Sequence, residues 1–205
     1  MLKPGLVRSR APCQHRPMPI DSRMVDLGTP APDFTLPAVT TGDLVSLKDF
    51  DTPALLVVFL SNDCPYVQHI ETQLAEMAAR YAERGLAVVG INANDPVINP
   101  EDALEHLAGH AEHAGFTFPY LYDADQAMAA AYRAACTPDF FLYGPDRTLA
   151  YRGQFDGARP GNSVPVTGES LAAAIDQVLA GNPAPEPQYA SLGCNIKWRP
   201  GNEPG

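Results

Sequence analysis

The chain has 205 residues, of which 45% are hydrophobic and 19% charged, a composition typical of one globular domain with extensions. Its formal net charge of −10 argues against nucleic acid or an anionic membrane as the main partner. The sequence also lacks an apolar run near the ~20 residues that span a bilayer.

The first 23 residues carry five basic side chains, one acid and four prolines, without hydrophobic periodicity. They also lack the apolar stretch of a secretory signal. We therefore expect a disordered basic arm over residues 1–23, followed by a folded domain over residues 24–181. Four cysteines, at positions 13, 64, 136 and 194, are too few for a disulfide framework, so the sequence predicts a cytoplasmic protein with reactive thiols.

The folded domain opens with a predicted hairpin. Two short strands, Asp33–Leu36 and Leu44–Leu47, flank a turn of the sequence Thr41-Gly42-Asp43. The apolar run Ala54–Leu60 follows, and its length and continuity are typical of a strand buried on both faces.

Cys64 lies four residues after this run and directly before a helical pattern. Pro65 fits the first helical position, and a stripe of apolar residues follows at three- and four-residue steps: Val67, Ile70, Leu74, Met77 and Tyr81. Cys64 is then at or near the N-cap, where the partial positive charge of the helix favours a thiolate, while Asp63 opposes it. The sequence thus predicts a reactive thiol; the alternative is a small buried residue that starts a helix.

Strands and helices alternate through the rest of the domain. We expect a strand over 86–91, a helix from Asn99-Pro100 to about His113, an extended segment over 118–122, a helix over 123–134, a hairpin of strands 139–143 and 149–155, and a helix over 169–180. This order predicts a mixed α/β sheet with parallel central strands and helices on both faces.

Residues 182–205 are rich in proline, yet they include large apolar groups such as Leu192, Ile196 and Trp198. A disordered tail rarely holds so many, so we expect this tail to pack on the domain.

Neither a metal nor a cofactor is predicted. His106, His110 and His113 share one face of a helix, but the catalytic Glu of a His-Glu-x-x-His motif is missing, so a solvated face is expected. The one glycine-rich stretch, residues 153–161, does not follow a strand–helix junction and so does not fit a phosphate loop.

Several motifs together resemble a known family. They are Ala31–Leu36, Asn62–Val67, Cys136–Leu142, Tyr151–Gln154 and Gly193–Trp198. The chain from Met24 to Trp198 resembles the redoxin branch of the thioredoxin fold, the alkyl hydroperoxide reductase/thiol-specific antioxidant proteins, and within it the peroxiredoxin-like group. The resemblance implies a thioredoxin-like fold with an N-terminal β-hairpin and a docking C-terminal tail.

Two departures from the family patterns bear on activity. Val67 stands where the second cysteine of a thioredoxin Cys-x-x-Cys motif would be. Val57 and Ser61 stand where peroxiredoxins place a proline and a threonine before their reactive cysteine. Ser61 could imitate the threonine, but Val57 cannot imitate a proline, which weighs against a standard peroxidase mechanism.

The resemblance also assigns roles. Cys64 is the expected attacking thiolate, and the resolving thiol is Cys136, Cys194 or an external thiol such as glutathione. Both Cys136 and Cys194 have a packing role as the alternative. The Thr137–Pro138 bond is expected to be cis and to lie against the helix start, so that Pro65, Thr137 and Pro138 bind an extended disulfide-bearing substrate as an added strand.

Three functions are consistent with these roles. The first is an antioxidant thiol–disulfide oxidoreductase, acting on a disulfide-bearing protein or a small thiol with an external thiol reductant. The second is a thiol peroxidase that uses Cys64. The third is a non-catalytic binding or redox-sensing module, which the missing second cysteine of the Cys-x-x-Cys motif supports.

Overall fold

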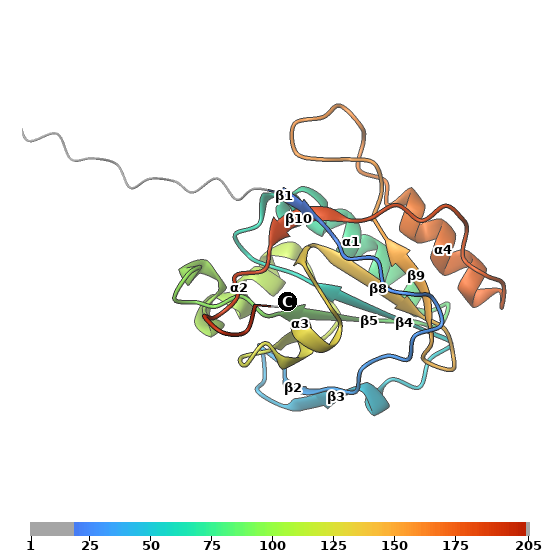
Figure 1. The fold of residues 1–205 in the computed structure, drawn as a ribbon. Helices are drawn as coiled ribbons and strands as arrows, with labels where there is room; N and C mark the ends of the chain where they lie inside the picture. Colours follow the sequence, from blue (N-terminus) through green and yellow to red (C-terminus); the bar gives the residue numbers. More distant parts are fainter. Residues whose placement is uncertain (1–18, 204–205) are drawn as a thin grey trace, which may run out of the picture.

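A five-stranded mixed sheet forms the centre of the protein, in a computed structural model that describes residues 19–203 (Figure 1). The strands lie in the order β6 (Tyr120–Tyr122), β5 (Leu86–Asn92), β4 (Ala54–Phe59), β8 (Asp139–Tyr143) and β9 (Leu149–Gly153). β4, β5 and β6 are parallel, whereas β8 and β9 are antiparallel to their neighbours. The predicted mixed α/β sheet is therefore confirmed.

The central strand β4 is buried along its whole length, which explains its continuous apolar sequence. Ala54, Leu56 and Val58 point to one face, which is covered by α1 (Pro65–Ala82), α2 (Leu104–Ala114) and α4 (Glu169–Leu179). The alternate residues of β4 point to the other face. That face is covered by α3 (Ala127–Ala131) and by the hairpin of β2 (Thr35–Pro37) and β3 (Leu44–Ser46).

Helix α1 forms as its sequence predicts. Cys64 is its N-cap residue, Pro65 occupies the first helical position, and the apolar stripe from Val67 to Tyr81 is buried. Because this stripe packs on β4, the helix start is fixed at the end of the central strand, and Cys64 with it.

A second, three-stranded sheet joins the two ends of the chain. It runs in the order β1 (Pro19–Asp21), β10 (Leu192–Asn195) and β7 (Cys136–Thr137), with β10 antiparallel to both neighbours (Figure 1). Within the arm expected to be disordered, residues 19–23 are therefore ordered, and that part of the prediction is wrong. The backbone groups of β10 provide the reason, since they give β1 a ladder of hydrogen bonds. Residues 1–18 of the predicted arm lie outside the described residues.

The helix expected from Asn99 is interrupted. A 3-10 turn, η2 (Pro100–Asp102), precedes α2, and Ala103 between them is extended. The interruption turns the Asp102 carboxylate into the interior, where it accepts several hydrogen bonds. Helix α3 is also shorter than expected, because Asp123 lies before it and accepts a hydrogen bond from Ala129 N at 2.8 Å.

One of the histidines expected on a solvated face is buried instead. His110 is 5% exposed, and its Nε2 lies 3.1 Å from Glu71 Oε2 on the neighbouring helix α1. Its ring also packs edge-on against Phe116 and Tyr120. His110 therefore serves the packing of α2 on the sheet. Within residues 19–203, helices long and apolar enough to cross a bilayer are absent.

A fully buried ion pair holds the entry to β8. Arg152 Nη2 donates to Asp139 Oδ2 at 2.9 Å, and the guanidinium group lies 3.9 Å above the Phe141 ring. Asp139 Oδ2 also accepts a hydrogen bond from Ala135 N at 3.0 Å. Burial raises the pKa of Asp139, and the charge of Arg152 opposes this rise. The pair thus ties together both sides of the short strand β7.

Replacing Arg152 with Met should destabilise the protein, because it leaves the buried Asp139 carboxylate without a partner. We expect a loss of about 3–5 kcal/mol in the free energy of unfolding, measured by urea denaturation. Arg84→Met is the matched control: it breaks the half-exposed Arg84–Asp176 pair (2.7 Å) and should cost less than about 1 kcal/mol. Similar losses for the two variants would contradict this account of the buried pair.

Candidate active site

Cys64 lies where β4 gives way to α1, and its side chain is only 1% exposed. Its carbonyl oxygen accepts hydrogen bonds from Val67 N (2.9 Å) and Gln68 N (3.0 Å), which begin the helix. The sulfur is therefore held at a helix N-terminus inside the protein, as the sequence predicts.

Asp102 fixes the loop that leads to Cys64. Its carboxylate accepts hydrogen bonds from Ser61 Oγ at 2.7 Å and from Asn62 N at 2.6 Å. The amides of three further residues donate to it: Asn92, Asn94 and Asn99. A carboxylate that is 0% exposed is thus satisfied by neutral donors. The asparagines that follow β5 in the sequence were a signal for this positioning role of Asp102. The prediction of a continuous helix from Asn99 left that role unrecognised.

Cys194 reaches Cys64 from the far end of the chain. In the register of β10 against β7, Cys194 pairs with Thr137, and its Sγ lies 2.9 Å from Cys64 Sγ. Gly193 permits this approach, because a Cβ at that position would lie 2.0 Å from Thr137 O. The close contact of two backbones therefore places the two thiols together.

The remaining predicted residues surround this pair. The Thr137–Pro138 bond is cis, as expected, and Thr137 O lies 3.0 Å from Cys64 Sγ, where it accepts the proton of the neutral thiol. Pro65 is exposed at the first position of α1. Cys136 is fully buried, and its thiol donates to Pro138 O at 3.6 Å. The structure thus brings Cys64, Thr137 and Cys194 together and directs the Cys136 thiol to a backbone carbonyl.

The two neighbouring thiols have opposite proton affinities. Burial raises the pKa of Cys64, but hydrogen bonds to its thiolate, led by the one from Cys194, outweigh this effect and bring the pKa to about 6. The hydrogen bond to Cys64 and burial raise the pKa of Cys194. Burial, followed by the charge of Asp139, also raises the pKa of Cys136. At neutral pH the pair therefore holds one thiolate, at Cys64, and one thiol, at Cys194.

This arrangement is suited to thiol–disulfide exchange. A thiolate attacks a disulfide, and a second thiol within bonding reach then resolves the mixed disulfide. Within residues 19–203, groups of three or more His, Cys, Asp or Glu side chains that could hold a metal ion are absent.

Comparison with known proteins places the chain among the redoxins. A sequence model of the AhpC/TSA family matches residues 27–152. The structure of a hypothetical protein from Sinorhizobium meliloti 1021 is 53% identical and has a TM-score of 0.87, with 88% of this chain and 99% of that chain covered.

Two further proteins are similar to this chain over part of its length. Thiol-disulfide oxidoreductase ResA of Geobacillus thermodenitrificans is 26% identical over 118 residues, which are 58% of this chain and 63% of ResA, so the match spans less than two thirds of that relative. A Chlorobium tepidum protein provisionally named thiol:disulfide interchange protein DsbE is 23% identical, with 76% of this chain and 99% of that chain covered. Its TM-score of 0.60 indicates a shared fold, which confirms the expected thioredoxin-like architecture.

Removing the Cys194 thiol should raise the pKa of Cys64. In Cys194→Ala the hydrogen bond to the thiolate is lost while burial remains, so we expect the pKa to rise from about 6 toward or above the ~8.5 of a free thiol. At pH 7 Cys64 is then mostly protonated in the variant and mostly ionised in the wild type. The ultraviolet absorbance of the thiolate, titrated in reduced protein, measures this change. Cys136→Ala is the control and should leave the titration unchanged; a Cys194→Ala titration still centred near 6 would refute the assigned cause.

Replacing Gly193 with Ala should separate the two thiols, because the new Cβ would collide with the Thr137 carbonyl. We expect Cys64–Cys194 disulfide formation under mild oxidation to slow by about tenfold or more, since the close approach of the reacting atoms is lost. Peptide mapping by mass spectrometry follows the bridge over time. Gly109→Ala, at a helical position with open space around its Cβ, should bridge at the wild-type rate. Equal rates in the two variants would show that β10 does not position Cys194.

Proposed function

The chain belongs to the AhpC/TSA family, and from that premise we propose that it is a thiol–disulfide oxidoreductase in which Cys64 attacks and Cys194 resolves. The observation that carries the proposal is the 2.9 Å separation of the two sulfurs at the start of α1. The thiol–disulfide relatives support the reaction class, and the choice of cysteines rests on the geometry.

The proposed reaction has two exchange steps. The Cys64 thiolate attacks one sulfur of a substrate disulfide, which forms a mixed disulfide and releases the first substrate thiol. Cys194 then gives up its proton and attacks Cys64 Sγ, which releases the second substrate thiol and leaves a Cys64–Cys194 disulfide. The two cysteines are oxidised and the substrate disulfide is reduced by two electrons. An external thiol reductant reverses the bridge by the same exchange.

The pKa values favour these roles in this order. An attacking thiol is most effective when its pKa lies near the ambient pH, and the pKa of Cys64 is about 6. Cys194 stays protonated next to it and so does not compete as a nucleophile. Cys194 is activated once Cys64 has entered the mixed disulfide, because the negative charge beside it has then gone. The proposal keeps the expected cytoplasmic location, where thiol reductants are abundant.

The thiol peroxidase alternative finds less support in the geometry. Ser61, which could imitate the peroxiredoxin threonine, donates its hydroxyl hydrogen to Asp102 instead of facing a bound peroxide. Val57 lies within the buried strand β4. A non-catalytic module, in turn, gives no account of two free thiols placed within 2.9 Å of each other.

Single substitutions of the three cysteines separate the proposed roles. Cys64→Ser should abolish disulfide reduction, and Cys194→Ser should give one turnover to a stable mixed disulfide at Cys64. Cys136→Ser should retain reduction near the wild-type rate and serves as the matched control. Thiol release from a small aromatic disulfide, with mass spectrometry of the protein, measures all three. Undiminished turnover in Cys64→Ser, or trapping in Cys136→Ser but not in Cys194→Ser, would overturn the assignment.

A further inference from the structure

The backbone edge beside Pro138 is already occupied by the chain itself. β10 pairs with β7 through the Cys194–Thr137 register, and Ser191 Oγ donates to Pro138 O at 2.8 Å. The outer edge of β10 is covered in turn by β1. A protein substrate that adds as a strand at Thr137 therefore meets a filled site. Since Cys64 is 1% exposed and Cys194 4% exposed, the substrate must reach them from another side.

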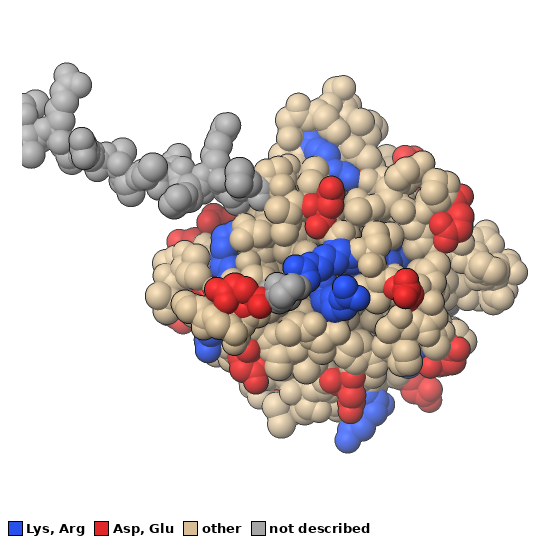
Figure 2. Space-filling model, in the orientation of Figure 1, with Lys and Arg blue, Asp and Glu red and all other residues tan. Residues whose placement is uncertain are grey.

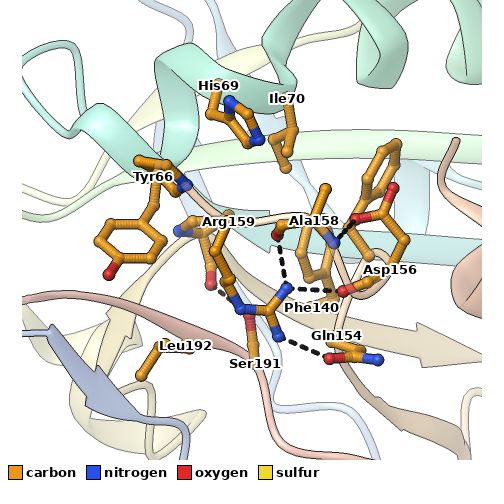
Figure 3. Close-up of a pocket in the computed structure, with 13 residues that line it drawn as sticks. Tyr66, His69, Ile70, Phe140, Gln154, Asp156, Ala158, Arg159, Ser191 and Leu192 are labelled. Carbon is orange, nitrogen blue, oxygen red and sulfur yellow. Dashed lines mark hydrogen bonds between the residues drawn. The ribbon is translucent and has the colours of Figure 1, made fainter. Parts of the chain in front are cut away.

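A small pocket lies beside this filled edge and is lined in part by Pro138, Ser191 and Leu192 (Figure 3). Three of its lining residues are close in sequence to the site: Tyr66 follows Cys64 by two positions, Pro138 follows Thr137, and Leu192 precedes Cys194 by two. Burial, followed by the charges of Cys194 and Cys64, raises the pKa of Tyr66. The pocket thus lies next to the chain segments that carry the two thiols, although neither cysteine lines it.

Arg159 carries a positive charge into this pocket without a carboxylate partner. Its guanidinium group donates to the carbonyl oxygens of Asp156 and Ala158, each at 2.6 Å, and to Gln154 Oε1 at 2.5 Å (Figure 3). Ion pairs between Arg159 and a carboxylate are absent from residues 19–203.

The one carboxylate among the residues that line this pocket, that of Asp156, already has hydrogen-bond donors. Asp156 is buried, and its carboxylate accepts hydrogen bonds from three backbone N–H groups, those of Ala158, Thr167 and Gly168. These bonds hold the projecting loop between β9 and α4 (Figure 1), and Figure 2 shows basic surface beneath that loop. Arg159 is therefore oriented by neutral groups, and its positive charge remains available to a ligand.

His69 adds a second unused polar group to the same pocket. Its Nε2 atom is buried and lacks a hydrogen-bond partner, and the ring points from α1 toward the pocket (Figure 3). The free space is about 10 Å³, which holds one water-sized group. The enclosed space therefore takes one oxygen of an anionic group such as a carboxylate, while the rest of the ligand lies outside it, over the Tyr66 side.

We propose that Arg159 and His69 bind a carboxylate of the substrate, so that the direct substrate of Cys64 is a small anionic disulfide and not an extended protein strand. This inference rests on the proposed function of Cys64 and Cys194. The carboxylate pairs with Arg159 while the substrate sulfur lies against Cys64. The chemistry is the two-step exchange described above: the substrate disulfide breaks into two thiols, and the Cys64–Cys194 disulfide forms.

The test compares two small disulfides whose end groups differ in charge. Dithiodipropionate is a dianion, and bis(2-hydroxyethyl) disulfide is a neutral analogue of similar size. Single-turnover oxidation of the reduced full-length protein is followed by Cys64–Cys194 bridge formation. We expect Arg159→Gln to slow the reaction with the dianion by about tenfold, because one charge-assisted hydrogen bond to its carboxylate is lost. The reaction with the neutral disulfide should slow by less than about twofold. Arg159→Lys keeps the positive charge and should restore much of the rate with the dianion. Arg84→Gln should change neither rate.

The outcomes separate this inference from the function on which it rests. If neither disulfide oxidises the wild type faster than it oxidises free cysteine, the proposed function fails. If both react and Arg159→Gln slows both equally, or slows neither, the anion site alone is overturned. If the wild type reduces insulin disulfides as fast as it reduces the small dianion, the inference that extended protein strands are not its direct substrates is overturned.

Discussion

The contact between β10 and the Thr137 carbonyl is the constraint on which the candidate active site depends. Two backbones approach there so closely that Gly193 has no space for a Cβ. The contact brings a cysteine from position 194 to within 2.9 Å of the thiol at the start of α1. In the proposed reaction it also compensates for the missing second cysteine of the Cys-x-x-Cys pattern, because the tail supplies a thiol that the helix lacks.

Two buried polar groups hold the backbone on either side of this contact. Asp102 fixes the loop before Cys64 through neutral donors, and the Arg152–Asp139 pair fixes the segment around Thr137. Both carboxylates are inside the protein, where their hydrogen bonds fix one backbone conformation because leaving a donor or acceptor unpaired is costly. The sulfur separation is thus a property of a rigid framework, although it joins residues 130 positions apart.

The same strand has two consequences for function. By pairing with β7, β10 supplies the proposed resolving thiol, and by filling that edge it closes the site to an added protein strand. The lowered pKa of Cys64 depends on the first consequence, because the Cys194 thiol donates to the thiolate. The proposed choice of substrate depends on the second, because the pocket near Arg159 and His69 is where we expect small anions to bind.

Local sequence determined the central strand, the helix start at Cys64 and the hairpin of β8 and β9, because hydrophobic periodicity, a first-turn proline and turn residues act over a few positions. The family motifs added the cis bond before Pro138. Only the tertiary structure placed the Cys194 thiol against Cys64, ordered Pro19–Asp21 as a strand, and turned Asp102 inward. Each of these outcomes depends on pairing between segments far apart in the chain, such as β10 with β7, and local patterns carry no record of register or of which edge a distant strand will fill.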